Sequence, residues 1–125
     1  MNQKKRIGTI VLLFITTIFY GCKQNNPITE FSTENWYEVE WKQRYHMLDD
    51  LFEEVDLVGM SATQIEQLLG KCSVRHEAYW SDEGTVDYHW GYVVRYDWWY
   101  GDEYLFIGFK DDIVVSFDLV YGSDI

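Results

Sequence analysis

The spacing of apolar residues changes near Cys72, and this change restricts the chain to a small set of folds. Before Cys72 the apolar residues recur about every 3.6 positions, as on one face of a helix. After it they recur at every second position, as on one face of a strand. Helices followed by strands with short connections are typical of an α+β domain. We therefore expect two N-terminal helices packed on one face of a roughly four-stranded antiparallel sheet.

Two helices are expected from local signals. The first would start near Trp36 and end near residues 54–56, with an apolar stripe formed by Trp41, Tyr45, Leu48, Phe52 and Val55. The second would cover about residues 62–69. Ser61 and Gln64 have the spacing of a capping box, and Gly70 is placed to end the helix in a left-handed conformation.

Four strands are expected within residues 74–80, 87–98, 104–110 and 113–121. Every even position of the second segment is apolar or aromatic. The short connection at residues 110–112 indicates a hairpin between the last two strands. Their shared core face would contain Leu105, Ile107, Phe109, Ile113, Val115, Phe117 and Leu119.

The N-terminus is typical of a secretion signal. A positively charged start precedes the 14 uncharged residues Ile7–Tyr20, a length too short to cross a bilayer as a helix. Gly21-Cys22 then resembles the cleavage and lipidation site of bacterial lipoproteins. We expect residues 1–21 to be a signal peptide, residues 22–35 to be lipidated Cys22 and a polar linker, and residues 36–125 to be the domain.

The expected location is the cell envelope. Lys23 follows the cysteine where an inner-membrane retention signal would have Asp, which favours the outer membrane in a cell that has two. The alternative is an uncleaved anchor in which Cys22 is an incidental thiol, because Phe19 and Tyr20 stand where lipoproteins prefer Leu and a small residue.

The net charge limits the possible partners. The whole chain carries −11, and loss of the three positive charges in residues 1–21 leaves −14. Such a surface repels the phosphates of nucleic acid and the head groups of anionic lipid. We therefore expect no nucleic-acid partner and a membrane contact through the lipid anchor. The acidity is either a solubilising surface or a means of attracting a basic protein.

Motifs for catalysis or cofactor binding are not found in the sequence. The three histidines do not have the spacing of a known metal motif, and none of the serines lies in a Gly-x-Ser-x-Gly turn. His76 would fall on the apolar face of its strand, as a core histidine. Cys72, the one thiol left once Cys22 is acylated, is expected to be a small buried hydrophobe. We expect no enzyme activity, no cofactor and no metal.

Aromatic residues are in excess, with six tryptophans, ten tyrosines and seven phenylalanines. The sheet face that the helices leave open would hold part of this excess, and its candidate binding residues are Tyr79, Trp99, Tyr104 and Phe106. Aromatic side chains are enriched in protein interfaces and also stack on sugars. The alternative is that these side chains only cover the sheet.

The segment RYHMLDDLFEEVDLVGMSATQIEQLLGKC, which starts at Arg44, resembles the helical half of the small-lipoprotein family typified by SmpA/OmlA (BamE). The shared elements are Leu57, Gly59-Met60-Ser61, Ile65 and Leu68-Leu69-Gly70, followed by an apolar strand–turn–strand ending. Cys72 departs from the proline that the family usually has there. The resemblance implies a fold similar to β-lactamase-inhibitor-protein modules, no catalytic residues, and a role as an envelope scaffold or as an inhibitor or immunity protein. A carbohydrate-binding lipoprotein is the alternative.

Overall fold

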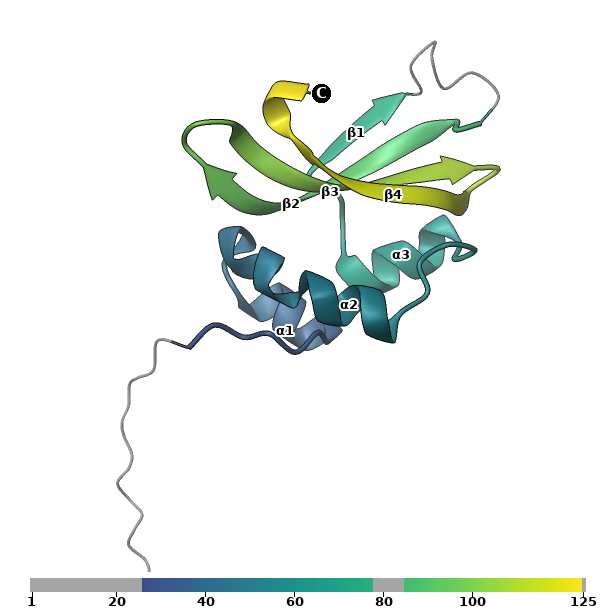
Figure 1. The fold of residues 1–125 in the computed structure, drawn as a ribbon. Helices are drawn as coiled ribbons and strands as arrows, with labels where there is room; N and C mark the ends of the chain where they lie inside the picture. Colours follow the sequence, from purple (N-terminus) through teal and green to yellow (C-terminus); the bar gives the residue numbers. More distant parts are fainter. Residues whose placement is uncertain (1–25, 78–84, 125) are drawn as a thin grey trace, which may run out of the picture.

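The computed structural model describes residues 26–77 and 85–124, which form a helical layer on one face of a sheet (Figure 1). The helical layer contains α1 (Thr33–Glu38), the 3-10 helix η4 (Trp41–Met47), α2 (Leu48–Glu54) and α3 (Ala62–Leu69). The sheet contains β1 (Val74–Glu77), β2 (Tyr88–Asp97), β3 (Gly101–Lys110) and β4 (Ile113–Tyr121). The 3-10 helix η6 (Gly122–Asp124) follows β4.

The strands lie in the order β1-β2-β3-β4, and each is antiparallel to the next. This arrangement confirms the α+β class and the four-stranded antiparallel sheet. The described residues contain three α-helices where two were expected. The expected signal peptide, Cys22 and Tyr79 lie outside the described residues.

The additional helix, α1, begins inside the segment expected to be a linker. The Ser32 side chain accepts a hydrogen bond from the backbone N–H of Asn35 and so caps the helix. The backbone N–H of Phe31 donates a hydrogen bond of 2.7 Å to a carboxylate oxygen of Asp50 in α2, and the Phe31 ring packs against the core. Residues 31–35 therefore pack as part of the folded domain.

The helix expected from near Trp36 to about residue 55 is divided among the end of α1, η4 and α2. A 3-10 helix has 3.0 residues per turn, so a stripe spaced for 3.6 residues per turn does not stay on one face. Leu48 is buried as expected, whereas Trp41 is exposed to 39%. The expected stripe is therefore wrong at its first residue.

The second expected helix is confirmed as α3. Ser61 accepts a hydrogen bond from the backbone N–H of Gln64, and the Gln64 side chain accepts one from the backbone N–H of Ser61. Gly70 follows with a φ of 83°, a conformation that favours glycine. The capping box and the terminating glycine both lie where the sequence placed them.

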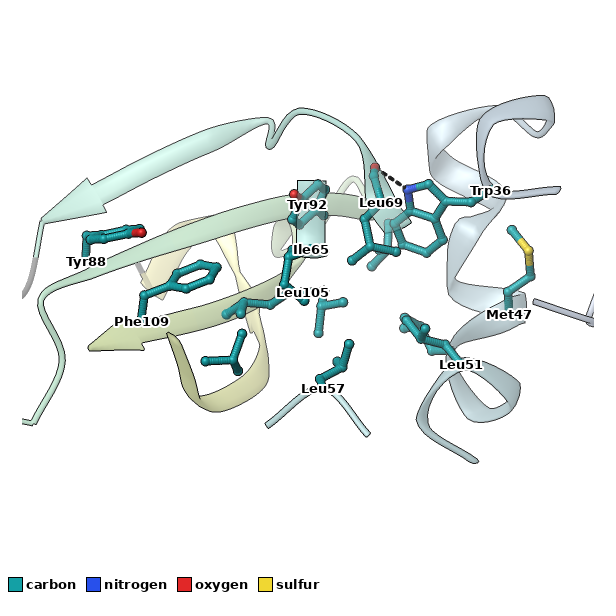
Figure 2. Close-up of a cluster of buried hydrophobic side chains, with 14 residues drawn as sticks. Trp36, Met47, Leu51, Leu57, Ile65, Leu69, Tyr88, Tyr92, Leu105 and Phe109 are labelled. Carbon is teal, nitrogen blue, oxygen red and sulfur yellow. Dashed lines mark hydrogen bonds between the residues drawn. The ribbon is translucent and has the colours of Figure 1, made fainter. Parts of the chain in front are cut away.

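The core lies between the two layers and is drawn in Figure 2. Trp36 comes from α1, Leu51 from α2, Ile65 and Leu69 from α3, and Tyr92, Leu105 and Phe109 from the sheet. All of these side chains are essentially inaccessible to solvent. Burial of this apolar surface is the main stabilising contribution to a domain of this size.

Two irregularities in register change which residues face the core. In β2, a shift between Val93 and Arg95 turns Arg95 toward the helical layer, where its guanidinium lies 5.0 Å from the centre of the Tyr45 ring. In β4, a shift pairs Val114 with Phe109 and buries Val114. Ile113 and Val115, expected in the core, are exposed instead, because an extra residue in one strand reverses the side-chain alternation beyond it.

Candidate functional site

The open face of the sheet is filled at its centre and is not an exposed aromatic platform. Phe106 is only 8% exposed, because the rings of His76 and His89 lie against it at centroid distances of 5.7 and 5.1 Å. A Cβ atom at Gly91 would lie 2.8 Å from the Phe106 ring, so the glycine makes room for that ring. The prediction that Phe106 belongs to an accessible binding face is therefore wrong.

The two histidines on this face also change an expectation. His76 and His89 are paired opposite each other on β1 and β2. His76 is half-buried against Phe106 on the open face and does not lie in the core between the layers. Within residues 26–77 and 85–124, no group of three or more His, Cys, Asp or Glu residues is placed to hold a metal ion.

The remaining predicted binding residues do not form one surface. Tyr104 is half-buried on β3, opposite Val93 and Val120. Trp99 is in the turn between β2 and β3, outside the regular sheet. Tyr79 lies outside the described residues. Phe106 is thus covered, Tyr104 is half-buried and Trp99 lies in a turn, so the three described candidates do not share one surface.

The turn between β2 and β3 presents three consecutive aromatic residues, Trp98, Trp99 and Tyr100, which we call the aromatic tip. Their exposed fractions are 74%, 69% and 54%, the first two being the highest among the exposed large hydrophobic residues. The Trp98 and Trp99 rings meet edge to face at 5.2 Å with an interplanar angle of 89°. The sequence showed this aromatic run, but not its position in a turn.

Hydrogen bonds from Asp97 fix the backbone of the aromatic tip. Its carboxylate oxygen accepts bonds of 2.8 Å from the Trp99 N–H and 3.2 Å from the Tyr100 N–H. Gly101 closes the turn with a φ of 88°. The tip therefore exposes its rings from an ordered backbone, which lowers the entropy cost of binding through them.

Two shallow hollows connect the start of the described chain with the aromatic end of β2. The first has a volume of about 530 Å³ and is lined in part by Asn26, Ile28 and Gln43. The second has a volume of about 250 Å³ and is lined in part by Gln43, Arg95 and Tyr96. Because Gln43 lines both, the N-terminal segment and the end of β2 lie at the same end of the fold (Figure 1).

The sheet edge formed by β4 is the second exposed apolar surface. Val115, Phe117 and Leu119, which we call the apolar edge, are exposed to 42%, 37% and 38%. The Phe117 ring packs on Phe52 of α2 at 5.0 Å, so this surface continues onto the helical layer. Phe117 and Leu119 pair with core residues of β3, as the sequence predicted, but their position on the edge strand leaves them partly in solvent.

Only the first part of the β4 backbone edge is covered. The backbone N–H of Gly59 donates to the carbonyl of Val114, and the N–H of Val114 donates to the carbonyl of Met60. Past Val114, no backbone bond between the described residues is found on the outer side of β4. An edge strand with apolar side chains and open backbone groups is a template for pairing with another chain.

Cys72 is a half-buried free thiol that packs against the core, and burial raises its pKa. A raised pKa lowers the fraction of nucleophilic thiolate at neutral pH. No charged or polar residue is fully buried within the described ranges.

Comparisons with known proteins add no assignment: no protein-family model, curated protein or solved structure matches the chain. In the described ranges, no helix is long and apolar enough to cross a bilayer. The resemblance to the SmpA/OmlA (BamE) family therefore stays a prediction from the residues that carry it.

Proposed function

We propose that this chain is a non-enzymatic lipoprotein, anchored to the membrane through Cys22, that binds another protein through the apolar edge of β4. The observation that carries the proposal is the exposure of Val115, Phe117 and Leu119 along one edge strand. Large apolar side chains clustered on a surface mark interaction sites more often than isolated ones do.

The mode of binding follows from the geometry of the edge. A partner strand that pairs with β4 beyond Val114 would satisfy its outer backbone groups and lie beside Phe117 and Leu119, which share one face of the strand. In such strand addition, backbone hydrogen bonds supply affinity and the side chains supply specificity. The Phe52–Phe117 contact extends the surface and offers the partner a larger apolar area.

The charge of the chain indicates the chemistry of the partner. A chain of −14 after signal removal attracts basic proteins over long range and accelerates their association. The exposed Asp118 lies within β4, next to Phe117 and Leu119. We therefore propose a partner that presents an apolar strand flanked by Lys or Arg. Both an envelope scaffold and an inhibitor or immunity protein agree with this chemistry, and the acidity favours the second.

The test is a purification of the tagged full chain from detergent-solubilised membranes, followed by identification of the bound proteins. Leu119→Lys introduces a cation into the apolar edge and should remove a partner that copurifies with the unchanged chain. Tyr37→Lys is the matched control, because Tyr37 is an exposed aromatic residue on α1, in the other layer. If Leu119→Lys copurifies with the same proteins as Tyr37→Lys, this edge is excluded as the binding site.

Lipidation has its own test, the mass of the mature N-terminus. The proposal predicts a diacylglyceryl group on Cys22, with the first 21 residues removed. Replacement of Cys22 by Ser should leave the precursor uncleaved, and an unmodified Cys22 in the membrane-extracted chain would reject the anchor.

A carbohydrate-binding lipoprotein is the second candidate, and the aromatic tip is the observation that favours it. Exposed tryptophan rings stack on sugars, and Trp98 and Trp99 are both available. A glycan array probed with the chain decides the question: specific binding that Trp99→Ala abolishes would favour this candidate over protein binding.

A further inference from the structure

The aromatic tip and the start of the described chain occupy one end of the fold, and this placement leads to a second site. We propose that Trp98, Trp99 and Tyr100 insert into the head-group layer of the bilayer to which Cys22 is anchored. The tip would thus fix the orientation of the domain on the membrane. The inference rests on the lipid anchor of the proposed function and adds a second membrane contact to it.

The distance between the anchor and the domain is short. Asn26, the first described residue, follows Cys22 by four positions. A fully extended chain spans at most about 3.6 Å per residue, so at most about 14 Å separates Asn26 from an acylated Cys22. Residues 26–28 line a hollow together with Val39 and Gln43, so this segment already lies on the domain. The end of the domain at Asn26 must therefore lie close to the bilayer surface.

The aromatic tip lies at this same end. Gln43 lines the hollow next to Asn26 and also the hollow next to Arg95 and Tyr96, and Tyr96 is two residues from Trp98. In Figure 1 the connection between β2 and β3 and the N-terminal segment both lie at the left of the fold. A bilayer that holds the N-terminal segment at this end therefore also faces the tip.

The chemistry of the tip fits the membrane interface. Tryptophan and tyrosine combine an apolar ring with a polar N–H or O–H group, and they are enriched at the level of the head groups. Acidic residues flank the tip on both sides: Asp97 precedes it, and Asp102 and Glu103 follow Gly101. The Asp97 carboxylate accepts hydrogen bonds from Trp99 and Tyr100, which offsets part of the repulsion from lipid phosphates.

Lys42 and Arg95 line the adjoining hollow. Lys42 lies 3.4 Å from a carboxylate oxygen of Glu40 and Arg95 lies 4.0 Å from one of Glu103, so these pairs would have to exchange partners for the cations to bind lipid phosphates.

A sugar fits the same rings less well. The two tryptophan rings are nearly perpendicular, at 89°, so they do not form one continuous platform on which a sugar chain could stack. The short connection to Cys22 also keeps this end of the domain against the bilayer. The observations therefore favour lipid as the occupant of the tip.

The experiment uses the full chain purified from bacterial membranes and reconstituted into phosphatidylcholine vesicles with brominated acyl chains, which quench nearby tryptophan fluorescence. The unchanged chain should be quenched. The double variant Trp98→Phe, Trp99→Phe keeps two aromatic rings on the tip, and it should lose most of the quenching. Trp90→Phe is the matched control, because Trp90 packs on Phe109 and Tyr88 within the domain, and it should keep the quenching.

Three results would overturn the inference. The quenching distinguishes the first two, and the mass of the N-terminus distinguishes the third from both. If the chain is acylated and the double variant is quenched as strongly as Trp90→Phe, tryptophans other than Trp98 and Trp99 lie at the lipid. An acylated chain without quenching keeps the tip in water, and a fluorescence change with oligosaccharide would then assign the tip to sugar. In both cases the anchor and the β4 surface remain. A chain that is not acylated and stays outside the vesicles rejects the anchor of the proposed function together with this inference.

Discussion

The indole Nε1–H of Trp36 donates a hydrogen bond of 3.0 Å to the backbone carbonyl of Leu69 (Figure 2). The carbonyls in the last turn of a helix have no partner within the helix. Trp36 belongs to α1 and Leu69 is the last residue of α3, so this bond joins the two helices. The hydroxyl of Tyr92 donates a bond of 2.7 Å to the next carbonyl, that of Gly70. Side chains from α1 and β2 thus supply hydrogen-bond donors to the carbonyl groups at the C-terminal end of α3, inside the core.

Trp36→Phe should lower the free energy of unfolding by about 1–3 kcal/mol through the unpaired carbonyl, because a buried acceptor that loses its donor costs that much. Loss of ring volume would add to this cost. The free energy of unfolding is measured by urea denaturation, with circular dichroism as the signal. Trp41→Phe is the control, because Trp41 is partly exposed on η4 and should change stability by less than about 0.5 kcal/mol. Equal stability of the two variants would mean that the bond contributes nothing.

Ser61→Ala should cost about 1 kcal/mol, because it removes the side-chain acceptor of the capping box of α3. Thr63→Ala is the matched control on the same helix: Thr63 is exposed and alanine is a better helix former. Thermal unfolding should show a lower midpoint for Ser61→Ala only. A similar fall in both variants would contradict a specific role of the cap.

Gly91→Ala should destabilise the domain by about 1–3 kcal/mol, the usual cost of overpacking. Its added Cβ would lie 2.6 Å from Cγ2 of Val74 and 2.8 Å from the Phe106 ring. Gly122→Ala is the control, since its nearest neighbour would be 3.4 Å away. Chemical denaturation compares the two. If the free energy of unfolding of Gly91→Ala is unchanged, the open face of the sheet is packed more loosely than the contacts of Phe106 imply.

The domain should lose stability above pH 10 because of its buried tyrosines. Burial, together with the hydrogen bond to Asp112, raises the pKa of Tyr88 to about 12, and burial also raises the pKa of Tyr92. Above the ordinary tyrosine pKa, the unfolded chain releases these protons while the folded chain keeps them. Folding then becomes less favourable as the pH rises.

Each such tyrosine contributes a slope of up to about 1.4 kcal/mol per pH unit between pH 10 and pH 12. Unfolding free energies at pH 8, 10.5 and 11.5 measure this slope. Tyr88→Phe should reduce the alkaline slope, and Tyr100→Phe, which changes an exposed tyrosine, should leave it unchanged. The expectation fails if all three proteins show the same slope.

The sequence predicted those parts of the fold that local signals determine. The capping box at Ser61 and Gln64, the terminating Gly70 and the alternation of β2 up to Val94 all appear in the structure. It did not predict α1 as a separate helix that starts at Thr33, because six residues with one buried tryptophan have no periodicity to detect. The register shifts in β2 and β4 depend on pairing with β3, so no single strand could reveal them.

The candidate binding surface was harder to predict than the fold. Alternation indicated which residues leave the core, but not what covers them. Phe106 is covered because Gly91 leaves space for its ring and because histidines from β1 and β2 lie against it. Phe117 and Leu119 were assigned to the core face correctly, yet the edge position of β4 exposes them. The sequence did hold one signal for this exposure. When consecutive strands pair in order, the last of them lies at an edge of the sheet.

The most direct test of protein binding through β4 is photo-crosslinking in living cells that make the full chain. A photoreactive residue at position 119 should give one discrete adduct with another protein, and Phe117→Lys in the same chain should remove it. The same photoreactive residue at position 37, on the surface of α1, should not give that adduct. The absence of an adduct from position 119, identical adducts from both positions, or an adduct with a second copy of this chain alone would contradict the proposed function.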